Sequence, residues 1–403
     1  MIDFDKARQL VLSRARPLGT VRVPLGRALG CVIAESVKAR DPIPLFDGSA
    51  VDGFAVHVKD VASASATTPA RLTLQYTIRA GDAPGAAVKK GHAVKVLTGA
   101  PIPPGTTAVV MKEHVLEGAD EIRVVRGAKR EDGIRRQGAE FAKGTTVFAR
   151  GTFITPAVIG MLATLGCATV KVYKKPRVAV IVTGNELRSP SSKLRTGEIR
   201  DSNSFAIAAA LRAIGIQPVM TAHARDTEIA VRGVLSKALR KADAVITVGG
   251  VSVGDYDHVK DVLAALKVTR VFWSVAMKPG KPNYFGTAGK TLVFGLPGNP
   301  VSALVSFMVF VKPALARMMG DARPAARLKA VLTKELVKKP GRIEFVRGAY
   351  ALDAHDELAV TPTTGQDSHM VGGIAAANGL IVFPKDAARL NKGSLVDVLP
   401  LEW

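Results

Sequence analysis

Three neighbouring segments decide the fold: AVITVGGVSVGDYDHVK at residues 244–260, MKPGKP at residues 277–282 and TLVFGLPGNPVSA at residues 291–303. The first and third open with an apolar run that breaks into a Gly-rich polar turn, a pattern typical of a buried strand leading into a loop. In an open α/β sheet, ligands bind in the crevice at the carboxyl ends of the strands. We therefore expect the three turns to lie together at one edge of such a sheet.

The residue types in these turns suit an oxyanion with a divalent cation nearby. They supply two carboxylates, two ammonium groups and glycines that free backbone N–H groups: Asp255, Asp257, Lys278 and Lys281 carry the charges. Mg²⁺ prefers one or two carboxylates together with substrate phosphates, and turns rich in exposed N–H groups bind anions. The segment predicts a site for a phosphate-like substrate and a metal ion.

The rest of the chain divides by pattern. Apolar strands alternate with helical runs at 204–214 and 228–241, which is typical of a parallel βαβ unit. Short β-like runs between Gly/Pro turns lie on both sides of this unit and predict two small β domains. Residues 1–40 are predicted to be helical, and Thr155 is predicted to be the N-cap of a further helix. The expected domains are a helical linking domain (residues 1–42 and 143–174), a small β domain (43–142), an α/β domain (175–323) and a C-terminal β-barrel-like domain (324–403).

Composition limits the function classes. The formal charge of the 403-residue chain is +22, but its bases are dispersed and aromatics are only 5% of the residues, so a solvated basic surface is favoured over a dedicated nucleic-acid site. Two cysteines without metal spacing argue against a disulfide framework or a zinc site. The apolar run at 301–311 is too short to span a bilayer, and the N-terminus has no signal-peptide pattern. We expect no membrane segment and a cytoplasmic location.

Several motifs allow two interpretations. TGNE at 183–186 is either a plain strand–helix turn or a crevice rim that carries Thr183 and Glu186. GDYD at 254–257 is either a metal or substrate contact or a helix start where the dipole favours acids. PGNP at 297–300 is either a Pro-bounded turn or a helix N-terminus that meets an anion. GTAGKT at 286–291 lacks the phosphate-loop spacing and predicts a hairpin turn.

Taken together, ten segments resemble the molybdopterin molybdenumtransferase family, which includes the gephyrin E domain. They occur in family order over nearly the whole chain: DPIPLFDGSAVDGFA, VLTGAPIPPG, IRRQGAE, VTGNEL, IRDSNS, GGVSVGDYDHV, MKPGKP, GLPGNPVSA, GRIEFVRG and QDSH at 366–369. One such block would be weak, but ten in order are highly specific.

The resemblance implies a multidomain α/β fold. Its parallel-sheet α/β domain resembles the molybdopterin adenylyltransferase domain, and two small β domains and a helical N-terminal and linking domain complete it. The implied reaction takes adenylylated molybdopterin and molybdate, cleaves the pyrophosphate link in a Mg²⁺-dependent step, releases AMP and inserts molybdenum into the dithiolene. The family is cytoplasmic and usually homodimeric, and a molybdopterin adenylyltransferase is the expected partner.

The resemblance also assigns residues. Five acids match catalytic positions: Asp52, Glu140, Glu186, Asp226 and Asp257, of which Asp226 and Asp257 are also the expected metal ligands. Six residues match the molybdate pocket: Lys278, Lys281, Pro282, Ser302, Arg347 and Ser368. The surrounding turns add six cofactor-binding candidates: Thr183, Gly184, Ser252, Gly254, Pro297 and Asn299.

The chain departs from the family pattern at a few positions. Asn185 replaces the carboxylate of the family's TGDEL turn, Glu140 stands where Asp is usual, and Asp367 replaces a Gly beside Ser368. An alternative function is a non-catalytic scaffold or a cofactor-binding paralogue on the same fold. The retained acids and lysines favour the enzyme, because loss of Asp257 or Lys281 would have favoured the scaffold.

Overall fold

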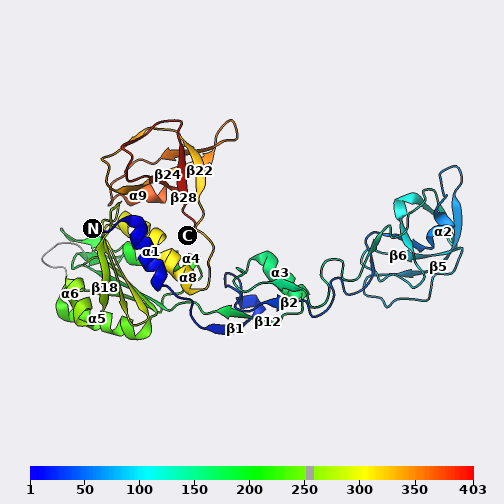
Figure 1. The fold of residues 1–403 in the computed structure, drawn as a ribbon, viewed down its shortest axis with the longest axis horizontal. Coiled ribbons are helices and arrows are strands. Elements are labelled where there is room, and N and C mark those ends of the chain that lie inside the picture. Colours follow the sequence, from blue (N-terminus) through cyan, green and yellow to red (C-terminus); the bar gives the residue numbers. More distant parts are fainter. Residues whose placement is uncertain (251–257) are drawn as a thin grey trace. The chain divides into compact units, whose positions relative to one another are not determined.

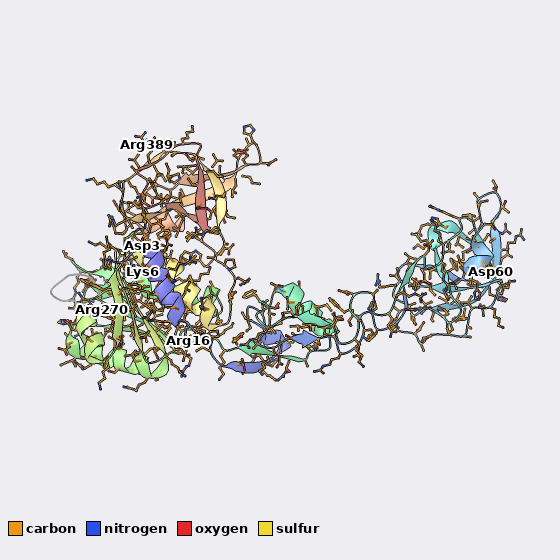
Figure 2. All side chains as sticks on the ribbon, in the orientation of Figure 1. Asp3, Lys6, Arg16, Asp60, Arg270 and Arg389 are labelled. Atoms are coloured by element: carbon orange, nitrogen blue, oxygen red, sulfur yellow. The ribbon has the colours of Figure 1, made fainter. Side chains whose placement is uncertain are left out.

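The computed structural model describes residues 1–250 and 258–403, which form two compact units (Figure 1). Unit 1 comprises Met1–Ala34, Gly151–Ile159 and Ala168–Trp403, and unit 2 comprises Glu35–Arg150 and Gly160–Cys167. The predicted 251–257 segment, with Ser252, Gly254, Asp255 and Asp257, lies outside the described residues.

A six-stranded sheet forms the centre of unit 1, in the order β16-β13-β17-β21-β20-β18. Its strands are β13 (Val178–Thr183), β16 (Met220–Ala224), β17 (Ala244–Val248), β18 (Thr269–Ser274), β20 (Pro282–Ala288) and β21 (Thr291–Leu296). The first four strands in the order are parallel, and β20 and β18 are antiparallel additions. The predicted hairpin turn is confirmed, because β20 and β21 pair directly across residues 288–291.

Helices cover both faces of this sheet, because residues along each central strand alternate between two apolar cores. Val178, Val180 and Val182 of β13 face one core, while Ala179 and Ile181 face the other. Figure 1 shows α5 and α6 on one side of the sheet and α1, α4 and α8 on the other. These helices are α1 (Phe4–Arg14), α4 (Asn203–Ala213), α5 (Glu228–Lys241), α6 (His258–Ala265) and α8 (Lys312–Met318).

The longest apolar helix of unit 1 lies in this core. Residues 300–318 run without a break through α7 (Pro300–Ser306), a π-helical turn (Phe307–Val311) and α8. By length and composition this helix could cross a membrane, but most of it is buried in the protein, and a core helix of a soluble protein passes the same test. Its apolar character is therefore explained by packing against the sheet.

The C-terminal part of unit 1 is a small closed barrel. Its strands are β22 (Leu328–Leu332), β24 (Ile343–Leu352), β25 (Leu358–Pro362), β26 (Gly379–Phe383) and β28 (Leu395–Pro400). The order β24-β25-β22-β28-β26 closes on itself through the β24–β26 pairing, so the barrel has no free edge there. The short strand β19 (Met277–Lys278) of the α/β chain segment pairs in parallel with β24.

Short elements complete this barrel region. They are β23 (Leu336–Val337), β27 (Arg389–Leu390) and α9 (Val371–Ala375). The α/β segment has its own two-stranded pair, β14 (Leu187–Arg188) with β15 (Ile199–Arg200).

Residues 1–40 are helical only over Phe4–Arg14, so the helical prediction for the rest of this stretch is wrong. Asp3 caps the helix by accepting from the N–H groups of Asp5 and Lys6 at 3.0 and 3.3 Å. Pro17 and Gly19 then disfavour helix continuation, and β1 (Thr20–Pro24) pairs with β12 (Thr169–Tyr173). A 3-10 turn (Leu25–Arg27) follows β1.

Unit 2 is mostly β structure, as predicted. Its main sheet has the order β7-β4-β6-β5-β9-β8: β4 (Gly53–Val56), β5 (Ala70–Ile78), β6 (His92–Val96), β7 (Ala108–Met111), β8 (Val115–Glu117) and β9 (Glu121–Val124). Two short pairs join β2 (Val37–Lys38) with β11 (Thr146–Phe148) and β3 (Gly48–Ser49) with β10 (Ile134–Arg135). Its helical turns are α2 (Val58–Val61) and a 3-10 turn (Lys112–His114).

Helix α3 (Pro156–Thr164) begins as predicted, with Thr155 Oγ1 accepting from Val158 N at 3.3 Å.

Candidate active site

The carboxyl ends of four parallel strands meet at one edge of the α/β sheet. The chain passes from β13 through α4 to β16, and then returns through α5 to β17 on the other side of β13. The strand order therefore reverses between β13 and β17, and a ligand crevice is expected at such a switch point. The turns that follow Thr183 and Val248 border this point, as predicted from the sequence.

A buried polar atom lies at the switch point. Thr183 is 6% exposed, and its Oγ1 has no hydrogen-bond partner within the described part of the chain. Gly249 follows β17 with φ +88°, and a Cβ there would lie 2.8 Å from the carbonyl oxygen of Thr183. Only glycine allows the two turns to approach so closely. Thr183 and the Gly249 turn thus lie directly against each other at the switch point.

The TGNE turn and the residues after β16 hold each other by a reciprocal pair of hydrogen bonds. Asn185 N donates to Asp226 Oδ2 at 3.0 Å, and Asp226 N donates to Asn185 Oδ1 at 3.2 Å. His223 Nε2 lies 2.7 Å from the carbonyl oxygen of Gly184 and ties the same turns together. Asn185, the departure from the family pattern, therefore fixes Asp226 without adding a second negative charge.

The predicted acid Glu186 lies at this rim as well. It is exposed, and its carboxylate approaches Gly184 so closely that a Cβ at position 184 would lie 2.7 Å from Glu186 Oε2. Gly184 has φ +151°. The turn therefore brings Thr183, Gly184, Glu186 and Asp226 together at one edge of the sheet.

The PGNP turn after β21 lies on the same edge and contacts the barrel. Asn299 Nδ2 donates to Ser368 Oγ at 2.8 Å, and Val301 N donates to the carbonyl oxygen of Ser368 at 3.2 Å. Asn203, which the sequence analysis missed, donates from Nδ2 to the carbonyl oxygen of Gly298 at 2.7 Å. Pro297, the first residue of the turn, and Ser302, in α7, are both buried.

Residues 277–282, here called the lysine loop, also reach this edge. Because Tyr284 of β20 pairs with Gly295 of β21, the Pro282 end of β20 lies beside the carboxyl end of β21. Lys281 is exposed, and Lys278 Nζ lies 3.3 Å from Glu344 Oε2 on the barrel strand β24. Glu344 was not predicted from the sequence, and its charge balances one of the two lysines.

A buried amide supports the lysine loop from below. Asn283 is 2% exposed, and its Nδ2 donates to Ser306 Oγ at 3.0 Å and to the carbonyl oxygen of Gly280. Sequence reasoning missed both Asn283 and Ser306, because neither belongs to a motif with chemistry of its own.

Arg347 is 1% exposed, although the resemblance implies a molybdate contact. Its Nη2 donates to the carbonyl oxygens of Gly365 and Asp367 at 2.6 and 3.3 Å, and its Nε has no partner among the described residues. Burial lowers the pKa of the guanidinium, and the nearby Asp367 carboxylate opposes this shift. Arg347 thus holds the residues just before Ser368.

Asp52 and Glu140 belong to unit 2. Asp52 Oδ1 accepts from Thr98 N and Thr98 Oγ1, both at 2.7 Å, and Lys112 Nζ lies 3.8 Å from Oδ2. The hydrogen bonds from Thr98 hold the pKa of Asp52 below its ordinary value. Glu140 is exposed. Asp52 is thus a fixed carboxylate, and the sequence alone gave no sign of its partner Thr98.

Three family descriptions match successive parts of the chain. They are the MoeA N-terminal region (domain I and II) over residues 2–166, the probable molybdopterin binding domain over residues 179–317 and the MoeA C-terminal region (domain IV) over residues 329–401.

Full-length relatives agree with these matches. The chain is 38% identical to molybdopterin molybdenumtransferase 2 of Mycobacterium tuberculosis, with 100% of both chains covered. It is 35% identical to the molybdopterin molybdenumtransferase of Haemophilus influenzae, with 99% of this chain and 98% of the relative covered.

A solved structure of similar fold is the molybdopterin biosynthesis moeA protein from Pyrococcus horikoshii OT3. It matches with a TM-score of 0.86 and 31% identity, over 99% of this chain and 100% of that chain. The predicted fold class is therefore confirmed. With its full-length relatives and three successive matching regions, the chain belongs to the molybdopterin molybdenumtransferase family.

Proposed function

We propose that this chain is a molybdopterin molybdenumtransferase that takes adenylylated molybdopterin and molybdate, releases AMP and inserts molybdenum into the dithiolene. The observation that supports this proposal is that the lysine loop, the PGNP turn and the Ser368 contact all lie at one edge of the α/β sheet. Ser368 contacts the PGNP turn, and the register of β20 with β21 places the lysine loop beside the same end of β21. Relatives named for this activity match the whole chain.

Charge and hydrogen bonding explain how such a site would work. Molybdate is a tetrahedral dianion, so lysine ammonium groups and a hydroxyl group suit its oxygens. Cleavage of a pyrophosphate link builds negative charge on the leaving oxygen, and preorganised donors aimed at that charge accelerate the step. The exposed Lys281 and the Ser368 hydroxyl are the groups that we assign to molybdate, with Lys278 beside them.

The residues at the rim fit a magnesium ion in part. The Asp226 carboxylate is held in place because its Oδ2 accepts a hydrogen bond from Asn185 N. The second expected ligand, Asp257, lies outside the described residues. No group of three metal-ligating side chains occurs in residues 1–250 and 258–403. When bound, the ion would neutralise charge on the pyrophosphate.

Asp226 and Asp257 are the residues that we propose to hold Mg²⁺. The remaining assignments come from the family likeness: a homodimer in the cytoplasm, which receives its substrate from a molybdopterin adenylyltransferase.

The test is to supply purified protein with adenylylated molybdopterin, molybdate and Mg²⁺, and to measure AMP and molybdenum cofactor together. We expect AMP release that requires the metal and cofactor formation that requires molybdate. Tight binding of the substrate without either product would contradict the proposal and favour the non-catalytic scaffold.

A further inference from the structure

Ser368 meets the PGNP turn through a loop that comes from the barrel. The Ser368 loop, residues 363–369, leaves β25 and brings Ser368 Oγ to 2.8 Å from Asn299 Nδ2. The carbonyl oxygen of Ser368 accepts from Val301 N at 3.2 Å. Because these two contacts join the barrel to the α/β sheet, the position of Ser368 depends on what holds its loop to the barrel.

Gln366 holds the loop by bonding to the backbone of Arg347 just beyond the end of a strand ladder. The ladder between β24 and β25 ends at the Gly348–Pro362 pair, one residue short of Arg347. There, Gln366 Oε1 accepts from Arg347 N at 3.1 Å, and Gln366 Nε2 donates to Arg347 O at 2.9 Å. Gln366 Oε1 thus takes the acceptor place that Thr363 O would have in a continued ladder, while Arg347 O accepts from both Gln366 Nε2 and Thr363 N.

The same carboxamide also closes the loop on itself. Gln366 Nε2 donates to Thr363 O at 2.9 Å, and Thr363 N donates to Arg347 O at 2.9 Å. Arg347 Nη2 binds the carbonyl oxygens on either side of Gln366, at Gly365 and Asp367. The residues directly before Ser368 are therefore fixed to β24 by a closed set of hydrogen bonds centred on Gln366.

We propose that Gln366 is a positioning residue that sets the place of Ser368 at the oxyanion site. This inference rests on the proposed function, in which Ser368 contacts molybdate. Gln366 itself bonds to the backbone of the barrel strand β24 and of its own loop, and it acts only through the loop.

The chain supplies a matched control on the same strand. Asn378 makes an equivalent pair of bonds with Tyr350 of β24: its Oδ1 accepts from Tyr350 N at 2.7 Å and its Nδ2 donates to Tyr350 O at 2.8 Å. Asn378→Ala removes the same two side-chain bonds to the barrel, but it leaves the Ser368 loop untouched.

The first measurement is the molybdate concentration at half-maximal cofactor formation in the full chain. We expect Gln366→Ala to raise it roughly five- to tenfold, the size expected for loss of one or two hydrogen bonds, with little change in AMP release at saturating molybdate. Ser368→Ala should raise this concentration as well. The double variant should need no more molybdate than Ser368→Ala alone, because both substitutions remove the same contact of Ser368 with molybdate. Asn378→Ala should leave it unchanged.

The second measurement needs no turnover. Amide hydrogen exchange at Val301 reports the contact with the Ser368 carbonyl, so it should speed up in Gln366→Ala but not in Asn378→Ala. The inference would be overturned if Val301 exchanged at the wild-type rate in Gln366→Ala, or if Asn378→Ala changed the exchange rate or the molybdate requirement as much as Gln366→Ala does. It would also be overturned if the double variant raised the molybdate requirement by the product of the two single effects. If the wild-type protein makes no cofactor, the proposed function fails, while the exchange result still decides whether Gln366 positions the loop.

Discussion

Single residues at the sheet edge combine charge with fixed geometry. Asp226 is held by the backbone and side chain of Asn185, which carries no charge of its own. A carboxylate at position 185 would add a second negative charge beside Asp226, and like charges at close range repel. The asparagine therefore keeps the hydrogen bond to Asp226 N and avoids that repulsion.

Asp226→Asn tests the proposed metal role at this scale. We expect AMP release to fall at least about a hundredfold, as for removal of a strong electrostatic stabiliser, because the amide cannot neutralise Mg²⁺. Steady-state AMP release at several Mg²⁺ concentrations measures the loss. Asp261→Asn, on the exposed side of α6, is the control and should retain wild-type rates. Turnover of Asp226→Asn within a few-fold of wild type would remove Asp226 from the metal site.

The lysines can be separated in the same way. Lys281 is exposed, whereas Lys278 pairs with Glu344. Lys281→Ala should raise the molybdate requirement more than it slows AMP release, because a cation with no ion-pair partner among the described residues contributes most to binding a dianion. Lys290→Ala, at the other end of the same hairpin, should change neither quantity. Equal effects of Lys281→Ala on both steps would place Lys281 at the pyrophosphate instead.

At the scale of elements, the lysine loop is built from two domains and one buried amide. Its strand β19 belongs to the sheet of the barrel, and β20 belongs to the sheet of the α/β domain. Asn283 ties the loop to Ser306 in the buried helix that begins at Pro300. Movement of the barrel relative to the α/β sheet would therefore displace Lys278.

Asn283→Ala should destabilise this region by about 1–3 kcal/mol, because the mutation leaves buried partners of the amide unsatisfied. Urea denaturation measures the free energy of unfolding of each variant. Ser306→Ala removes the other partner of the same hydrogen bond and is measured in the same way. The two variants should be non-additive when combined, because they share one hydrogen bond. Additive losses would mean that the Asn283–Ser306 bond contributes nothing to stability.

At the scale of the whole molecule, the candidate acids divide between the two units. Asp52 and Glu140 lie in unit 2, and Glu186 and Asp226 lie in unit 1. A two-fold symmetric dimer would give each of two sites acids from both subunits, because isologous pairing makes both sites at once. We predict such a composite site from the family likeness.

Mixing two inactive chains tests the composite site. An Asp52→Ala chain and an Asp257→Ala chain should partly restore AMP release after subunit exchange, because one site of each heterodimer then holds both intact acids. Subunit exchange is followed separately, for example by native mass spectrometry of differently tagged chains. Complete exchange without any recovery would show that each site is built within one chain.

Much of the fold was predictable because its signals are local. The alternation of apolar strands and helices after residue 175, the cap at Thr155 and the turn at 288–291 are each decided within a few residues. The same holds for the turns that carry Thr183, Asn299 and the lysines, since they lie within a βαβ pattern, where ligands bind at the carboxyl ends of the parallel strands.

Only the tertiary structure decided which partners fix these residues in place. Glu344 reaches Lys278 only because β19 pairs with β24, and Gln366 reaches Arg347 only because a strand ends one residue early. Pairings between residues so far apart in the chain depend on domain packing and on the unpaired backbone groups that it leaves, and no local pattern encodes them. The sequence by itself determined the fold class and the chemistry of the turns, and only the packed structure determined how those turns are fixed in place.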